Sequence, residues 1–214
     1  VFYTNAGTGE FLVGPDVGGG QSSILPQEYQ LVDYIEGDGR QYITTDILLN
    51  SNSSLEVKFQ ITEQNSTIYM FVLGARDSIQ KRVELIYHHS NKELAFVFGS
   101  VITQLPIDNI NDVNVLSVKN GKLKFNEWEY EISNEFALTY PLAVFSNNQQ
   151  GYIVQNISKN RFWKFTVNTN EKDYNFIPCY RKSDNVAGMY DIVEGKFYTN
   201  QGTGEFIVGP DVIG

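Results

Sequence analysis

The chain has 214 residues and a formal net charge of −9, and 14% of its residues are aromatic. This acidic balance, together with the absence of any run of lysine or arginine, argues against a nucleic-acid-binding surface, because phosphate binding needs a basic patch. The longest apolar stretches are strand-sized, and none approaches the roughly 20 residues that a membrane-spanning helix needs, so no membrane insertion is expected. Cys179 is the single cysteine, which excludes a disulfide framework and a zinc site built on thiolates.

The chain begins with a segment that it repeats near its end. Residues 1–17 read VFYTNAGTGEFLVGPDV and residues 196–212 read KFYTNQGTGEFIVGPDV, which is an offset of 195 residues. The two copies differ only at the pairs Val1/Lys196, Ala6/Gln201 and Leu12/Ile207. Repetition at a domain-sized interval is typical of a tandem array. We therefore interpret residues 1–17 as the closing hairpin of a preceding module.

This first copy is expected to contact a neighbouring module. A hairpin without the body of its own module exposes apolar surface and is marginally stable in water. We expect it to pack on a neighbouring copy of the module and to link copies head to tail. The side chains predicted to make this inter-module contact are Phe2, Tyr3, Phe11, Leu12 and Val13.

A linker is predicted over residues 18–27, because three glycines followed by Gln-Ser-Ser have the composition of flexible coil. One complete module is then expected over residues 28–214. Turn residues recur at intervals of about 8–12 residues in this region, which is typical of an all-β sandwich or barrel with only minor helix. The predicted strands are 28–35, 40–46, 53–62, 67–74, 82–89, 93–99, 112–119, 121–126, 128–133, 141–146, 161–168 and 173–179.

Two local patterns support these strands. Apolar residues occupy every second position from Leu55 to Ile61, which predicts a strand with one buried face. Asn120-Gly121 lies between two apolar runs and predicts a tight hairpin, because both residues tolerate positive φ. The closing repeat is predicted to form a further hairpin from strands 196–200 and 204–208 around the turn QGTG.

Several motifs suggest chemistry, and each has a simpler structural interpretation. Glu127, Glu129 and Glu131 point to one face of a strand, as the acids of some β-sandwich glycanases do, or form a solvent-facing acidic row. His88 and His89 are neighbours in a strand, face opposite sides and therefore cannot share a metal ion.

The remaining motifs are weaker. Cys179 is interpreted as a small buried apolar residue. Gly202-Thr203-Gly204 lacks the lysine of a phosphate-binding loop and is interpreted as a turn. The Asp and Asn cluster at 108–112 offers oxygen ligands to calcium without the spacing of a calcium-binding motif, and no other metal or cofactor is expected.

A polar segment provides the candidate ligand site. Residues 147–152 read NNQQGY and are interpreted as a solvated loop whose amides suit sugar hydroxyls and whose tyrosine suits stacking on a sugar ring. The candidate glycan-binding residues are Asn147, Asn148, Gln149 and Tyr152.

Both ends of the module resemble a known family. Residues 25–45 (LPQEYQLVDYIEGDGRQYITT) resemble the opening of concanavalin A-like, or laminin-G-like, jelly-roll domains of bacteriophage tail and head-fibre proteins and of gut-bacterial surface proteins. Residues 161–165, 173–181 and 188–200 resemble the closing strands of these domains. The resemblance implies a two-sheet antiparallel jelly-roll sandwich and no defined catalytic residues. Related glycanases carry a Glu-x-Asp-x-(x)-Glu strand, which this chain lacks.

The sequence therefore predicts a non-enzymatic structural or binding module of a tandem-repeat protein at a virion or cell surface, outside the cell. The expected partners are neighbouring copies of the module and cell-surface glycans. A glycanase of the concanavalin-like fold and a purely architectural spacer remain as alternatives.

Overall fold

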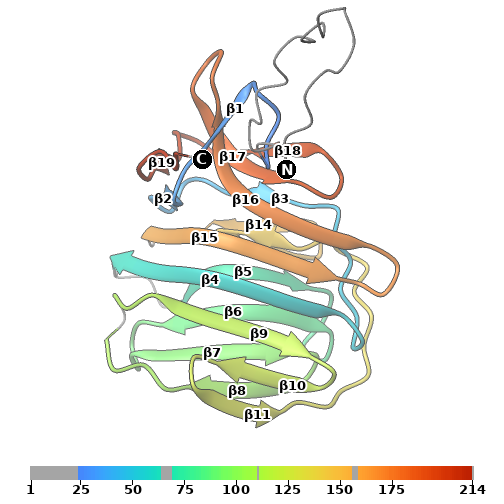
Figure 1. Ribbon diagram of the computed structural model, residues 1–214. Helices are drawn as coiled ribbons and strands as arrows, with labels where there is room; N and C mark the ends of the chain where they lie inside the picture. The colour runs from blue at the N-terminus through green and yellow to red at the C-terminus, as the bar shows by residue number, and fades with distance from the viewer. Residues whose placement is uncertain (1–23, 64–68, 110, 156–158, 214) are drawn as a thin grey trace, which may run out of the picture.

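A computed structural model describes residues 24–63, 69–109, 111–155 and 159–213 of the chain. These residues form an all-β sandwich of two sheets, and they contain no helix (Figure 1). The strands are β1 Tyr29–Leu31, β2 Ile35–Gly37, β3 Ile43–Thr44, β4 Ser54–Glu63, β5 Tyr69–Arg76, β6 Arg82–His88, β7 Glu93–Phe98, β8 Val101–Leu105, β9 Asn114–Lys119, β10 Lys122–Phe125, β11 Trp128–Glu131, β12 Ala143–Val144, β13 Ser146–Gln149, β14 Tyr152–Gln155, β15 Lys159–Asn168, β16 Asp173–Arg181, β17 Val186–Asp191, β18 Lys196–Thr199 and β19 Ile207–Val208.

The first sheet has the order β11-β10-β9-β4-β15-β16-β17-β18. Three short strands complete it: β1 pairs with β16, and β2 pairs with both β15 and β19. The second sheet has the order β14-β13-β5-β6-β7-β8, and β12 pairs with both β5 and β3. All pairs are antiparallel except β13 with β5. The architecture is therefore compatible with the predicted jelly roll.

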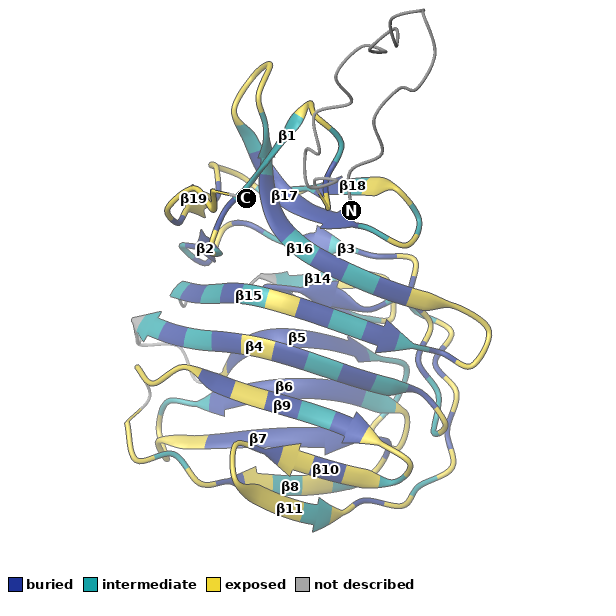
Figure 2. Ribbon diagram, viewed as in Figure 1, coloured by how far each residue is buried: buried dark blue, intermediate teal, exposed yellow. Residues whose placement is uncertain are grey.

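The core lies between the two sheets and is rich in aromatic side chains. The alternation predicted for β4 is confirmed, because Leu55, Val57, Phe59 and Ile61 are buried in the core while the residues between them reach the opposite face (Figure 2). Burying one side chain of this size contributes about 1.5–3 kcal/mol to folding. The core thus rests on the period-two pattern that the sequence displays.

The turn predicted at Asn120-Gly121 is also confirmed. Asn120 has a φ of 52° and Gly121 a φ of 74°, and they join β9 to β10 as neighbouring antiparallel strands. Two other predicted strands are shorter in the structure than the sequence indicated. Residues 28–35 give β1 and part of β2, and the region 40–46 keeps strand pairing only at β3. Leu25, at the end of the predicted linker, is already buried against the sandwich.

Candidate functional site

The repeated sequence KFYTNQGTGEFIVGPDV, residues 196–212, is called here the closing segment. Its first part, β18, pairs with β17, whereas its second part, β19, pairs with β2. The prediction of a hairpin over 196–208 is therefore wrong, since β18 and β19 do not pair with each other. The segment instead joins two separate parts of the first sheet.

The reason lies at Asn200, whose side chain binds a distant loop. Its Oδ1 accepts hydrogen bonds from the backbone N–H of Tyr42 (3.1 Å) and of Gly202 (2.7 Å). Its Nδ2 donates to the carbonyl of Gly204 at 2.8 Å. The QGTG run therefore follows the loop before β3 and does not fold back on β18.

Glycine is required where this run meets that loop. A Cβ on Gly202 would lie 2.0 Å from the carbonyl oxygen of Arg40, a distance that no side chain tolerates. The N–H of Thr203 donates to the same Arg40 carbonyl at 3.0 Å. Gly204 has a φ of +73°, in the left-handed region that favours glycine.

Phe206 anchors the closing segment in the core and is only 6% exposed. Its ring lies 4.8 Å from that of Phe145, which in turn lies 4.5 Å from the ring of Phe162 on β15. Phe145 has a φ of +64°, which is rare for a bulky residue and costs of order 1–3 kcal/mol. The packing that surrounds this ring, Phe206 included, holds that backbone conformation.

The end of the closing segment adds backbone hydrogen bonds along β1 and β2. The N–H of Gly209 donates to Tyr34 (2.8 Å) and that of Val212 to Leu31 (2.9 Å), while Pro210 accepts from Asp33 (2.9 Å). A Cβ on Gly209 would lie 2.8 Å from the ring of Tyr34, so the backbone passes directly over that ring. The segment is thus paired from end to end.

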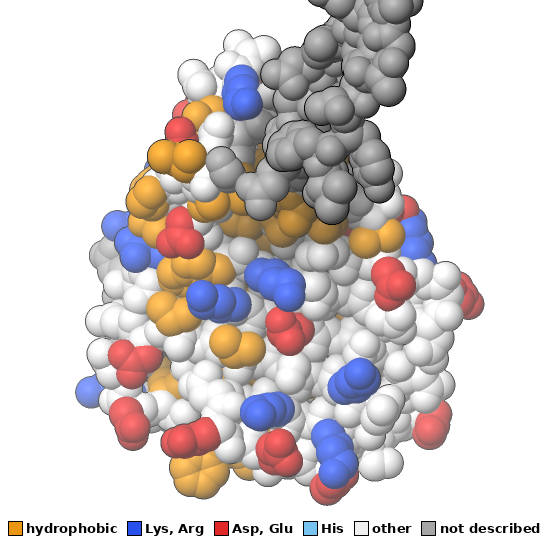
Figure 3. All heavy atoms as spheres, viewed as in Figure 1, with side chains coloured by type: hydrophobic (Ala, Val, Ile, Leu, Met, Phe, Trp, Pro, Cys, Tyr) orange, Lys and Arg blue, Asp and Glu red, His pale blue; other side chains and the backbone are white. Residues whose placement is uncertain are grey.

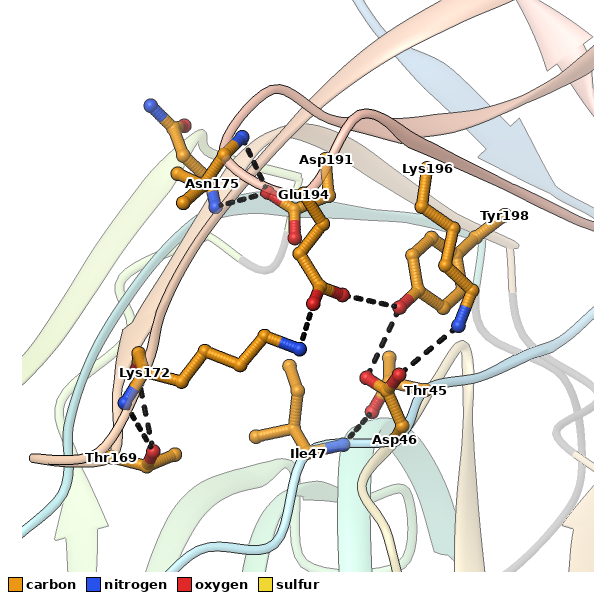
Figure 4. A network of polar contacts seen from close by, with 11 residues as sticks. Thr45, Asp46, Ile47, Thr169, Lys172, Asn175, Asp191, Glu194, Lys196 and Tyr198 are labelled. Atoms are coloured by element: carbon orange, nitrogen blue, oxygen red, sulfur yellow. Dashed lines mark hydrogen bonds and ion pairs between the residues drawn. The ribbon is translucent and has the colours of Figure 1, made fainter.

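A polar network surrounds β18 (Figure 4). The hydroxyl of Tyr198 donates to Asp46 Oδ1 at 3.1 Å, and Lys196 Nζ donates to Asp46 Oδ2 at 3.0 Å. Glu194 lies 3.4 Å from the same hydroxyl and forms an ion pair with Lys172. Burial, together with the nearby Asp46 charge, raises the pKa of Tyr198.

Asp46 shows the opposite shift. Burial alone would raise its pKa, but the hydrogen bonds from Lys196 and Tyr198 outweigh burial and lower the pKa of Asp46. The carboxylate therefore stays ionised beside the phenol. This arrangement fastens β18 to the loop that follows β3.

The predicted inter-module contact residues belong to the first copy of the repeat. Phe2, Tyr3, Phe11, Leu12 and Val13 lie outside the described residues, as does the predicted hairpin at 1–17. Their counterparts in the closing segment are Phe197, Tyr198, Phe206, Ile207 and Val208.

The predicted amide loop is a strand and a tight turn. Asn147 and Asn148 belong to β13 and are buried, at 0% and 3% exposed. Asn147 Nδ2 donates to Glu84 Oε1 at 2.7 Å, and Asn148 Nδ2 donates to the carbonyl of Pro141 at 2.9 Å. The interpretation of these two residues as parts of a solvated loop is therefore wrong, because their amides serve the packing of β13.

The two other predicted ligand residues lie at the surface of the same hairpin. Gln149 is half-buried, and Tyr152 is 80% exposed. Gln150 and Gly151 form the turn between β13 and β14 with φ values of 54° and 89°. The structure thus keeps one aromatic ring of the predicted set available to a ligand.

A groove on the outer face of the first sheet was not predicted from the sequence. Its volume is about 500 Å³, and it crosses β9, β4, β15 and β16. Ser117, Glu56, Thr166 and Asn175 are successive cross-strand partners along it. The polar positions that alternate with the core residues were the signal for this groove. This face carries scattered positive and negative side chains (Figure 3).

The acidic row at 127–131 lies on exposed β11. Glu131 pairs with Lys122 at 3.3 Å, and Glu129 lies opposite Lys124 in the register of β10 and β11. Trp128, on the same strand, is 52% exposed. The row is therefore a solvated ladder of opposite charges.

Two of the remaining candidate residues, Cys179 and His88, take part in packing. Cys179 is fully buried, and burial raises the pKa of its thiol to about 12, which confirms the apolar interpretation. The ring of His88 packs edge-on against Tyr69 at 4.5 Å. Within the described ranges, no three His, Cys, Asp or Glu side chains come together as a metal site.

Comparisons with known proteins give no family. No known family matches the sequence, and no curated protein matches it. A crystal structure of A. japonicus CB05 resembles the chain with a TM-score of 0.37 and 10% identity. The match covers 72% of this chain and 27% of that one, so the chain spans about a quarter of its length. None of the described segments forms a helix able to cross a membrane.

Proposed function

We propose that this chain is a non-enzymatic structural and binding module of a tandem-repeat protein at a virion or cell surface. One observation carries the proposal: the segment that the sequence repeats is an integral part of the module. Residues 196–212 bind the body of the fold through β17, β2 and Phe206. Because one copy completes one module, a second copy of the segment implies a second module of the same kind.

The tandem arrangement has a direct test. We expect the gene that encodes this chain to contain further segments of the form FYTN-x-GTGEF-x-VGPDV at intervals of about 195 residues, the spacing of the two copies. Neighbouring modules would then meet head to tail at these segments. A gene with no copy beyond these two would contradict the array.

Glycans are the proposed ligand class of the module. The groove on the first sheet offers hydroxyl, amide and carboxylate groups in cross-strand rows, and Tyr152 offers an exposed ring. Such groups hydrogen-bond to sugar hydroxyls and stack on sugar rings. Opposite charges are paired near the groove, as in the Lys164–Glu56 ion pair at 3.4 Å, which favours a neutral ligand.

A glycan array tests this assignment. Thr166→Trp should fill the groove and Tyr152→Ala should remove the exposed ring, so the variant that loses binding identifies the surface in use. Trp128→Ala, an exposed aromatic on β11, is the matched control and should bind normally. A correctly folded chain that binds nothing on a broad array leaves only the architectural role. Release of reducing sugar from any bound glycan would contradict the non-enzymatic assignment.

A further inference from the structure

We propose that the docking surface of the closing segment has a second occupant, residues 1–17 of the same chain. The two copies would then compete for one place beside β2. This inference goes beyond the proposed function and is independent of glycan binding. It follows from how residues 196–212 are bound and from which residues the two copies share.

The three positions at which the copies differ all face solvent in the closing segment. Ile207 is 55% exposed, and the side chain of Lys196 is 50% exposed in its ion pair with Asp46. Gln201 is exposed, and its side chain accepts one long hydrogen bond, 3.3 Å, from the N–H of Thr44. Exposed contacts of this kind contribute little to stability. Their loss would therefore not prevent binding.

The shared positions make the buried and sterically demanding contacts. Phe206 fills the core beside Phe145, Tyr198 is 6% exposed, and Gly202 and Gly209 pass over groups that exclude a Cβ. The first copy has the same residue at each of these four positions: Phe11, Tyr3, Gly7 and Gly14. It therefore carries the complete set of residues that the docking surface selects.

The chain is long enough to deliver the first copy to this surface. In the closing segment, Val212 hydrogen-bonds to Leu31, and Leu31 packs against the small apolar cluster that contains Leu25. A first copy in the same place would put Val17 at the position of Val212. The chain from Val17 to Leu25 spans up to roughly 26 Å when extended, and Leu31 contacts both Val212 and the cluster of Leu25.

The connection also has an ordinary topology. The closing segment runs antiparallel to β2, so a first copy in its place would form a hairpin-like pair with β1 and β2 through the linker. Residues 18–24 have the Gly- and Ser-rich composition of a linker, and a tether of this length gives an effective concentration on the order of millimolar. The tether therefore favours the chain's own first copy over that of a second molecule. In a tandem array, each such segment would be able to close the module before it or the module after it.

Hydrogen exchange read by mass spectrometry tests the proposal, since the sequence differences give the two copies distinguishable peptides. Gly202→Val places a side chain against the Arg40 carbonyl and should expel the closing segment. We expect its amides to exchange at least tenfold faster while the amides of residues 1–17 become protected by a similar factor. Gly7→Val, the twin substitution, is the control and should leave the closing segment protected. With both substitutions, neither copy should be protected.

Light scattering on the Gly202→Val chain identifies the source of the occupant. A monomer with protected residues 1–17 supports docking within the chain. Protection of residues 1–17 only in a dimer or larger species would overturn it in favour of a second copy. A folded monomer in which residues 1–17 stay unprotected would overturn it as well.

A second variant keeps the test valid if Gly202→Val unfolds the chain. Lys196→Val, Gln201→Ala and Ile207→Leu together convert the closing segment to the sequence of the first copy. Because all three positions face solvent, we expect amide protection in this segment to stay within about threefold of the original chain. A loss of protection across the segment would show that the first copy does not fit the surface, and the proposal would fail.

Discussion

The ring of Phe206 lies 4.8 Å from that of Phe145, at an interplanar angle of 44°, and joins the closing segment to the core. Phe145 holds this position with a φ of +64°. The contact therefore links a segment near the end of the chain to a strained residue between β12 and β13.

Phe206→Ala should destabilise the module by about 3–5 kcal/mol, since it removes a buried ring and leaves a cavity beside Phe145. Urea unfolding measures the loss. Ile207→Ala, at the adjacent exposed position, is the control and should change stability by about 0.5 kcal/mol or less. Equal effects of the two substitutions would show that Phe206 is no anchor.

At Phe145, glycine should be a better replacement than alanine. Both substitutions remove the ring, but glycine adopts a φ of +64° without the steric cost that alanine has there. We expect Phe145→Gly to unfold at a higher urea concentration than Phe145→Ala, by about 0.5–1 kcal/mol in stability. The opposite order would mean that the backbone relaxes once the ring is removed.

The sequence predicted those features of the fold that depend on nearby residues. Alternation over Leu55–Ile61 identified β4, and Asn120-Gly121 identified a turn, because each pattern is a property of a few consecutive residues. The closing repeat was assigned a hairpin on the same kind of evidence. Its course depends on Asn200 binding Tyr42, a partner 158 residues away in the sequence that local patterns do not reveal.

The placement of Asn147 and Asn148 in a solvated loop was wrong for a related reason. Asn147 and Asn148 are polar and lie beside a Gln-Gly turn, so their composition is that of a loop. Their burial depends on Glu84 and on the bare backbone of Gly74, where a Cβ would lie 2.7 Å from Asn147 Oδ1. Composition does not show that the buried Glu84 carboxylate accepts a hydrogen bond from the Asn147 amide. The groove on the first sheet could not be predicted from the sequence, because its position depends on the register of four strands.

Stability should fall in acid partly through Asp46. Its pKa is lowered in the folded chain, so the folded state binds a proton less readily than the unfolded state. The stabilising contribution is therefore present above the ordinary pKa of 3.8 and is lost as the pH falls through the lower folded value. Unfolding by urea at pH 6 and pH 3 should show a smaller loss for Asp46→Asn than for the original chain. An identical loss would exclude Asp46 as a contributor.

Cys179 should be inert in the folded chain. It is fully buried, and a thiol whose pKa is about 12 contains almost no thiolate at pH 8, the form that reacts with alkylating agents and disulfides. Iodoacetamide at pH 8 should therefore modify it at a rate set by opening of the fold, and urea should accelerate the reaction at least a hundredfold. Cys179→Ala retains a small apolar group and should stay folded. Because this variant contains no thiol, it serves as the blank for the alkylation reaction. Rapid modification without denaturant would show that the cluster around β1 and β16 opens readily, and that the thiol is more exposed than its packing indicates.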